Sequence, residues 1–295
     1  MPWAAQHPSA NCSARPLHES KSGATVTHPS SSPVLPMGTQ KSAAMPLPKS
    51  LVGYWREASR PLVSMAFVAP MLLAYESGLL LLGPQTMRNG ADVWLRSWLE
   101  TAGFGQYFLL PVLTCGILLA WHHVNRQRWQ VDMVVLWGML IESLALSFVL
   151  VLVAQLQSSF LVSLDRPWQV AALPGGGAIG QVVAFFGAGI YEELLFRLML
   201  LPVLAGVCRG CGLARNTSLG LAVLLSSLMF AAAHYRFDLT LGEFQLAKSI
   251  GDSFDWISFL FRFSAGGFFS LLFIFRGFGI AAGSHALYDI LVTLT

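Results

Sequence analysis

One stretch decides the class of fold: IGQVVAFFGAGIYEELLFRLMLLPVL, residues 179–204. It is long enough for a helix that crosses a bilayer, which needs about 20 mostly apolar residues. Glu192, Glu193 and Arg197 lie near its centre. Charged side chains are costly inside a membrane, and those that occur there usually serve a function. The stretch therefore predicts a membrane helix that carries a functional site.

The composition agrees with a membrane protein. The 295-residue chain is 55% hydrophobic and only 11% charged, and its mean hydropathy is +0.60. Soluble domains carry about 25% charged residues. The formal net charge of +3 is small, and the sequence has no stripe of basic and aromatic residues, so we expect no nucleic-acid partner.

Apolar runs of spanning length recur along the chain. They predict an all-α, polytopic integral membrane bundle of about seven or eight transmembrane helices. An eighth span, or an interfacial helix, could come from the stretches 84–105 and 236–255. The seven spans are expected near 61–83, 106–124, 132–155, 179–204, 217–235, 256–275 and 278–294.

The first 50 residues differ from the rest. They hold eight of the fifteen prolines, many serines and no apolar run of spanning length. Such a segment buries too little apolar surface to offset the entropy lost on ordering. We predict a disordered Ser/Pro-rich tail over residues 1–50 and a transmembrane helical domain over 51–295.

Two other apolar helices carry polar residues at regular spacing. Phe230 and His234 are four apart on one, and His285 and Asp289 are four apart on another. Residues four apart share a helical face, so Asp289 can orient His285. By the same rule Glu193 pairs with Arg197 and Glu192 points elsewhere. Each motif alone has a structural explanation, an ion pair or a hydrogen bond, but their conjunction predicts a site.

These residue types suit the hydrolysis of a peptide bond. A carboxylate or a metal ion can activate water, and imidazoles can stabilise the oxyanion and the leaving amine. Other intramembrane protease chemistries fit poorly. The sequence has no H-E-x-x-H of a metalloprotease, no G-x-G-D of an aspartyl protease and no G-x-S-G of a rhomboid-like protease.

The three motifs, E-E-x-x-x-R, F-x-x-x-H and H-x-x-x-(Asn/Asp), occur in the order typical of one family. The chain resembles the CPBP family of CAAX-protease and bacteriocin-processing intramembrane peptidases, related to the type II CAAX prenyl endopeptidase. The resemblance covers roughly residues 179–295, the peptidase core.

The resemblance implies a role for each polar residue. Glu192 would be the base that activates water, and Glu193 its neighbour, supported by Arg197. His234 and His285 would bind the water, a metal ion or the oxyanion. Asp289 would take the last polar position, which is often Asn in the family. If a metal ion such as Zn²⁺ is bound, Glu192, His234 and His285 would be its ligands.

The constellation of polar residues and the resemblance together imply an activity and a location, but family membership does not settle the substrate. The expected function is an intramembrane endopeptidase, metal-assisted or glutamate-dependent, that acts on a membrane-embedded or lipidated protein or peptide in the bilayer. The protein would be multi-pass, in the plasma membrane if the chain is prokaryotic. Two alternatives stay open: a non-enzymatic scaffold or bacteriocin-immunity protein, and a proton-coupled transporter.

Overall fold

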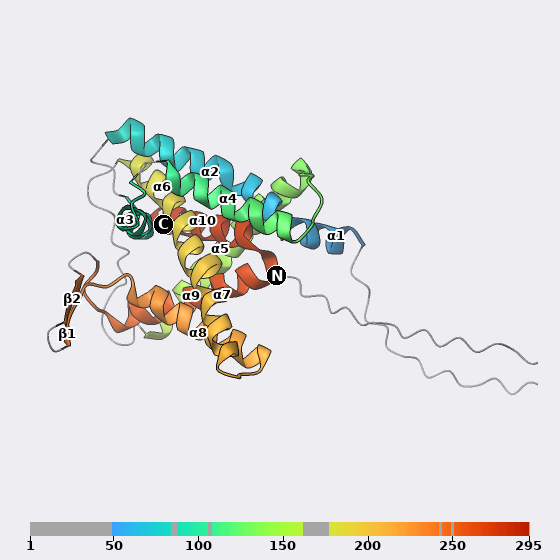
Figure 1. Ribbon diagram of the computed structural model, residues 1–295. Coiled ribbons are helices and arrows are strands. Elements are labelled where there is room, and N and C mark those ends of the chain that lie inside the picture. Colours follow the sequence, from blue (N-terminus) through green and yellow to red (C-terminus); the bar gives the residue numbers. More distant parts are fainter. Residues whose placement is uncertain are drawn as a thin grey trace, which may run out of the picture. The chain divides into compact units, whose positions relative to one another are not determined.

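A computed structural model describes residues 49–83, 88–105, 108–161, 177–241, 244–248 and 251–294. The predicted tail over residues 1–50 lies almost wholly outside the described residues. Apart from one β-hairpin, the described elements are helices (Figure 1). The elements are α1 (Lys49–Ala58), α2 (Pro61–Leu82), α3 (Gly90–Thr101), α4 (Leu109–Val124), α5 (Met133–Leu161), α6 (Ala178–Gly187), η3 (Ala188–Glu192), η4 (Leu194–Leu200), α7 (Leu201–Gly210), α8 (Arg215–Ala232), β1 (Phe237–Leu241), β2 (Phe244–Lys248), α9 (Trp256–Arg276) and α10 (Phe278–Leu294).

Each predicted span coincides with helical structure. Within the described residues, four helices are long and apolar enough to cross a membrane: α2, α5, α8 and α9. The apolar helices α4 and α10 are shorter, with 16 and 17 residues. The protein is thus a multi-pass helical membrane protein, and the total of seven or eight spans stays a prediction.

The two connecting stretches differ from each other. The stretch 84–105 contains α3, a helix of 12 residues. At about 1.5 Å per residue it reaches about 18 Å, too short for the roughly 30 Å hydrocarbon layer. The prediction of a helix in 236–255 is wrong, because β1 and β2 form an antiparallel hairpin there (Figure 1). Its polar sequence lacks an apolar face with a helical period, so local strand pairing satisfies the backbone instead.

The central element is α10, which contacts α2, α5, α6, α9 and η3. Its sequence begins FGIAAGSHA, and small residues let helix backbones approach closely in a membrane. A Cβ on Gly279 would lie 2.7 Å from Met139 Cε of α5, and one on Gly283 would lie 2.6 Å from Phe67 Cε1 of α2. The small residues therefore hold α10, which carries His285, in the middle of the bundle.

Several other intramembrane charges are paired. Arg276 makes a bidentate ion pair with Glu142, its Nε 2.5 Å from Oε1 and its Nη2 2.6 Å from Oε2. The Tyr54 hydroxyl donates to the same carboxylate at 2.6 Å. Arg96 of α3 pairs with Glu76 of α2 at 3.0 Å. These pairs join α1 to α5 and α9, and α3 to α2, so they fix the packing of the helices.

Candidate active site

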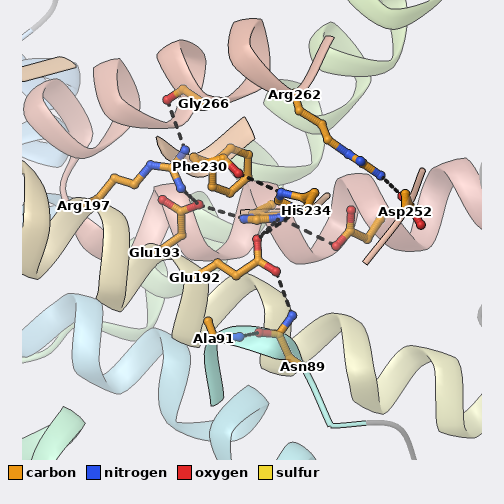
Figure 2. Close-up of polar contacts among 12 residues, drawn as sticks. Asn89, Ala91, Glu192, Glu193, Arg197, Phe230, His234, Asp252, Arg262 and Gly266 are labelled. Carbon is orange, nitrogen blue, oxygen red and sulfur yellow. Dashed lines mark hydrogen bonds and ion pairs between the residues drawn. The ribbon is translucent and has the colours of Figure 1, made fainter. Parts of the chain in front are cut away.

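The structure brings all six predicted site residues together. Glu192 ends η3, Glu193 follows it, and Arg197 lies in η4. His234 lies in the turn after α8, and His285 and Asp289 lie one helical turn apart on α10. Figure 2 labels Glu192, Glu193, Arg197 and His234 and shows their polar contacts. Glu192 is 9% exposed, and Glu193 and Arg197 are 0% exposed, so the cluster is largely shielded from solvent.

The helix that carries the paired acids is not a continuous α-helix. The helix predicted over 179–204 is present, but within it Ala188–Glu192 and Leu194–Leu200 are π-helical. Single π turns inside α-helices often occur at functional sites. The Ser226 hydroxyl of α8 donates to the Phe196 carbonyl oxygen at 2.9 Å, and this bond supports the wider turn.

A close helix crossing holds the first π turn against α10. A Cβ on Gly189 would lie 2.5 Å from the carbonyl oxygen of Ala282 and 2.8 Å from Cβ of Ala286. Only glycine permits this approach, because the nearest atom belongs to a backbone that cannot rotate away. The crossing sets the separation between Glu192 and His285.

Glu192 has two carboxylate oxygens in different surroundings. Oε1 accepts a hydrogen bond of 2.7 Å from the Asn89 side-chain amide. Oε2 lies 3.8 Å from Nε2 of His234 and 3.8 Å from Nε2 of His285. It has no hydrogen-bond partner among the described residues. The Nε2 atoms of both imidazoles therefore face the same carboxylate oxygen. Each of these two distances is too long for a direct hydrogen bond, but one small ligand could contact all three atoms.

The end of α8 fixes the His234 ring. Its Nδ1 lies 2.8 Å from the Phe230 carbonyl oxygen. Because a carbonyl oxygen only accepts, Nδ1 carries the proton, and in the neutral ring Nε2 presents its lone pair to Glu192. The Asp252 backbone N–H donates to the His234 carbonyl oxygen at 2.9 Å, which ties this turn to the segment before α9.

Two contacts orient the His285 ring. Its Nδ1 lies 2.7 Å from Oε1 of Glu193, a charge-assisted hydrogen bond. The ring stacks on Phe269, with centroids 4.5 Å apart and planes 13° apart. Nε2 then points to Glu192 and to Asp289, whose Oδ2 lies 3.7 Å away. The i,i+4 proximity expected for His285 and Asp289 is present.

Glu193 and Arg197 form the buried pair expected from their spacing. Arg197 Nη1 lies 3.0 Å from Glu193 Oε1. Its Nη2 donates to the Gly266 carbonyl oxygen at 3.1 Å, and its guanidinium lies 4.3 Å from the Phe230 ring centroid. The pair thus anchors η4 to α9 and α8. Glu193 therefore contacts both Arg197 and His285.

The site contains one polar residue that the sequence motifs do not identify, Asn89. It comes from the segment before α3 and contacts Glu192 from 103 residues away (Figure 2). Its only local signal is an N-cap position, where its Oδ1 accepts from the Ala91 N–H at 2.8 Å. No spacing rule connects that position with the paired acids.

The donor set is chemically suited to a divalent metal ion, since His nitrogen and carboxylate oxygen both bind zinc. Among the described residues, no group of three or more His, Cys, Asp or Glu side chains is arranged to hold a metal ion. The reaction derived below therefore includes no step through a metal, and the prediction of Zn²⁺ remains to be tested.

Comparison with protein families agrees with the three motifs. Residues 174–291 match the model of the family described as type II CAAX prenyl endopeptidase Rce1-like. No curated protein and no solved structure matched the chain. The matched region contains five elements of the site, from the π turns to α10, while α2 and α3 lie outside it. Residues 174–291 are thus similar to the Rce1-like type II CAAX prenyl endopeptidases.

Proposed function

We propose that the protein is an intramembrane endopeptidase that hydrolyses a peptide bond of a membrane-associated or lipidated protein, with Glu192 as the base that activates water. The arrangement around Glu192 Oε2 carries this proposal. That oxygen is buried, has no hydrogen-bond partner among the described residues and faces the Nε2 atoms of His234 and His285 at 3.8 Å each. A water molecule between these three atoms would donate to the carboxylate and to one imidazole.

The two imidazoles would take different roles. His234 donates through Nδ1 to a carbonyl oxygen, so its neutral Nε2 accepts a hydrogen bond from the water. Three carboxylates surround the His285 ring, those of Glu192, Glu193 and Asp289, at 3.8, 2.7 and 3.7 Å. They stabilise an imidazolium, whose Nε2–H would donate to the oxyanion of the tetrahedral intermediate.

The reaction can be written with its protons balanced. Glu192 takes one proton from water, and the resulting hydroxide adds to the carbonyl carbon of the scissile bond. The carbonyl π electrons move to oxygen, which His285 stabilises. When the intermediate collapses, the C–N bond breaks and Glu192 returns its proton to the leaving amine. Glu192 acts first as a base and then as an acid, so this one residue serves both the addition of water and the release of the amine.

The remaining site residues would act by positioning. Arg197 neutralises Glu193 in a place where neither side chain is exposed. Glu193 then accepts from the Nδ1–H of the His285 ring and fixes the direction of the ring. Asp289 would add a third negative charge near that ring. These contacts would hold the reacting groups in place before the substrate binds.

The family's name suggests the substrate class. A type II CAAX prenyl endopeptidase cuts a protein that carries a prenyl group, and a site between apolar helices suits a substrate with a lipid anchor. We propose a lipidated protein or peptide, cleaved in the bilayer of the membrane that holds the enzyme. In a prokaryote that would be the plasma membrane.

The test uses the purified full chain in lipid vesicles and a farnesylated peptide reporter, in water labelled with heavy oxygen. Hydrolysis predicts one labelled oxygen in the new carboxyl group of the product. Glu192→Gln should give no product, whereas Glu100→Gln, which changes an exposed glutamate of α3, should behave as wild type. The same peptide without the lipid should be cleaved more slowly. A chelator decides whether a metal ion takes part.

Other outcomes would support the alternatives. Protein that is folded but cuts neither peptide would contradict the protease and leave a scaffold or immunity role. Proton movement across vesicles that depends on Glu192, without cleavage, would favour a transporter.

A further inference from the structure

Asn89 contacts the base of the proposed reaction, yet it belongs to none of the three motifs and lies outside the matched region of the family. Its side chain makes two hydrogen bonds. Oδ1 accepts from the Ala91 N–H at 2.8 Å, and Nδ2 donates to Glu192 Oε1 at 2.7 Å. A backbone N–H only donates and a carboxylate only accepts, so the direction of the amide is fixed by both contacts.

Asparagine is the residue that satisfies both contacts. Aspartate and serine cap a helix as well as asparagine does, but an ionised aspartate has no donor and would repel Glu192. Serine is too short to reach from the cap to the carboxylate. Glutamine has the donor but adds a methylene, which moves its oxygen away from the cap. The position therefore requires one short side chain that accepts at one end and donates at the other.

The helix that carries Asn89 is firmly attached. Asp92, which is 0% exposed, accepts from Arg96 Nε at 2.6 Å and from the Tyr75 hydroxyl at 3.0 Å. Arg96 also pairs with Glu76, and that carboxylate accepts from the Tyr191 hydroxyl at 2.6 Å. Tyr191 directly precedes Glu192. Thus α3 is linked to the π turn indirectly, through Glu76 and the Tyr191 side chain, and its N-cap residue Asn89 contacts Glu192 itself.

We propose that Asn89 is a positioning residue for the base: its amide holds Glu192 Oε1, so that Oε2 stays directed at His234 and His285. This inference rests on the proposed function of Glu192. Without the amide, the carboxylate can rotate about its side-chain bonds, and a displacement of about 1 Å can lower a rate roughly 100-fold. The substrate does not contact Asn89 in this account, so KM should change little.

The first experiment separates the amide contact from the helix cap. Asn89→Ser and Asn89→Asp keep a cap and lose the amide that donates to Glu192, while Asn89→Ala loses both the cap and the amide. We expect kcat on the lipidated reporter to fall about 10- to 100-fold in all three, with KM within about threefold of wild type. All three should lower the melting temperature through the lost contact with Glu192, and Asn89→Ala should lower it most because it also loses the cap. Wild-type kcat in the serine and aspartate variants would overturn the inference.

The second experiment does not depend on cleavage. Melting temperatures are measured for Asn89→Ser, Glu192→Ala and the double variant, in a double-mutant cycle. If the amide holds Glu192, Asn89→Ser should change the melting temperature in the wild-type background and much less in the Glu192→Ala background. Equal changes in both would show that the two residues do not interact, and would overturn the inference.

The two experiments distinguish the possible failures. An active Glu192→Gln variant would refute the proposed role of the base, while a cycle that shows coupling would still establish the contact. If Glu192→Gln is inactive and Asn89→Ser is fully active, the role of Glu192 as the base is supported and only the role of Asn89 is refuted.

Discussion

The Nδ1 atom of His285 lies 2.7 Å from Oε1 of Glu193, the same oxygen that Arg197 approaches to 3.0 Å. One buried carboxylate therefore holds both the Arg197 guanidinium and the His285 imidazole. The sequence spacing predicts the first of these contacts, but the second joins residues that are 92 positions apart.

Glu193→Gln should impair both stability and activity. The variant leaves the buried Arg197 without its counter-ion, and removing one partner of a buried pair costs about 3–5 kcal/mol. It also replaces the charge that orients His285, so kcat should fall roughly 10- to 100-fold. Melting in detergent and cleavage of the reporter measure the two effects. Loss of stability with full activity would refute the role of Glu193 in holding His285.

Gly189→Ala should disturb the site through the backbone. Its Cβ would lie 2.5 Å from the Ala282 carbonyl oxygen, so η3 and α10 must move apart. Overpacking of this kind typically costs about 1–3 kcal/mol. We expect lower stability and lower kcat, because Glu192 and His285 lie on the two separated elements. Gly180→Ala is the matched control: nothing lies within 4 Å of its added Cβ, and it should keep wild-type activity.

Gly251→Ala should act on His234. Gly251 has a φ of 137°, and an added Cβ would lie 2.8 Å from the His234 carbonyl oxygen. Strain at such a backbone position costs of order 1–3 kcal/mol, and relief of that strain would shift the turn that carries the imidazole. Reporter cleavage should fall.

The neighbouring substitution Asp252→Asn supplies the comparison. Its ion pair with Arg262 is half-exposed and should contribute only about 0–1 kcal/mol. Equal effects of Gly251→Ala and Asp252→Asn on cleavage would contradict the account of how His234 is held.

Arg276→Met should lower stability without changing the chemistry. It leaves the Glu142 carboxylate inside the bundle without its bidentate partner, at a cost of about 3 kcal/mol. The folded fraction should keep its KM and its kcat, because the pair's hydrogen bonds among the described residues go to Tyr54 and Trp55 and not to the Glu192 cluster. Exposed Arg128→Met serves as the control and should shift stability by less than about 0.5 kcal/mol. A selective loss of kcat would show that the pair is coupled to the site.

Much of the helical fold follows from apolar run length, because a bilayer demands long apolar helices. The Glu193–Arg197 pair follows from i,i+4 spacing. The π turns could not be predicted from the sequence. An apolar segment has the same composition whether its backbone hydrogen bonds join residues four apart, as in an α-helix, or five apart, as in a π-helix. Asn89 was not predictable either, because its polar character suits any helix cap and only tertiary packing brings it to Glu192.

The central claim is that Glu192 supplies the base while contributing little to the fold. The most direct test measures, on one preparation of Glu192→Gln, the single-turnover rate of reporter cleavage and the melting temperature. The account predicts a rate lower by about 10²- to 10⁴-fold, the usual contribution of a general base, with melting close to that of wild type. A rate near that of the wild-type protein would contradict it.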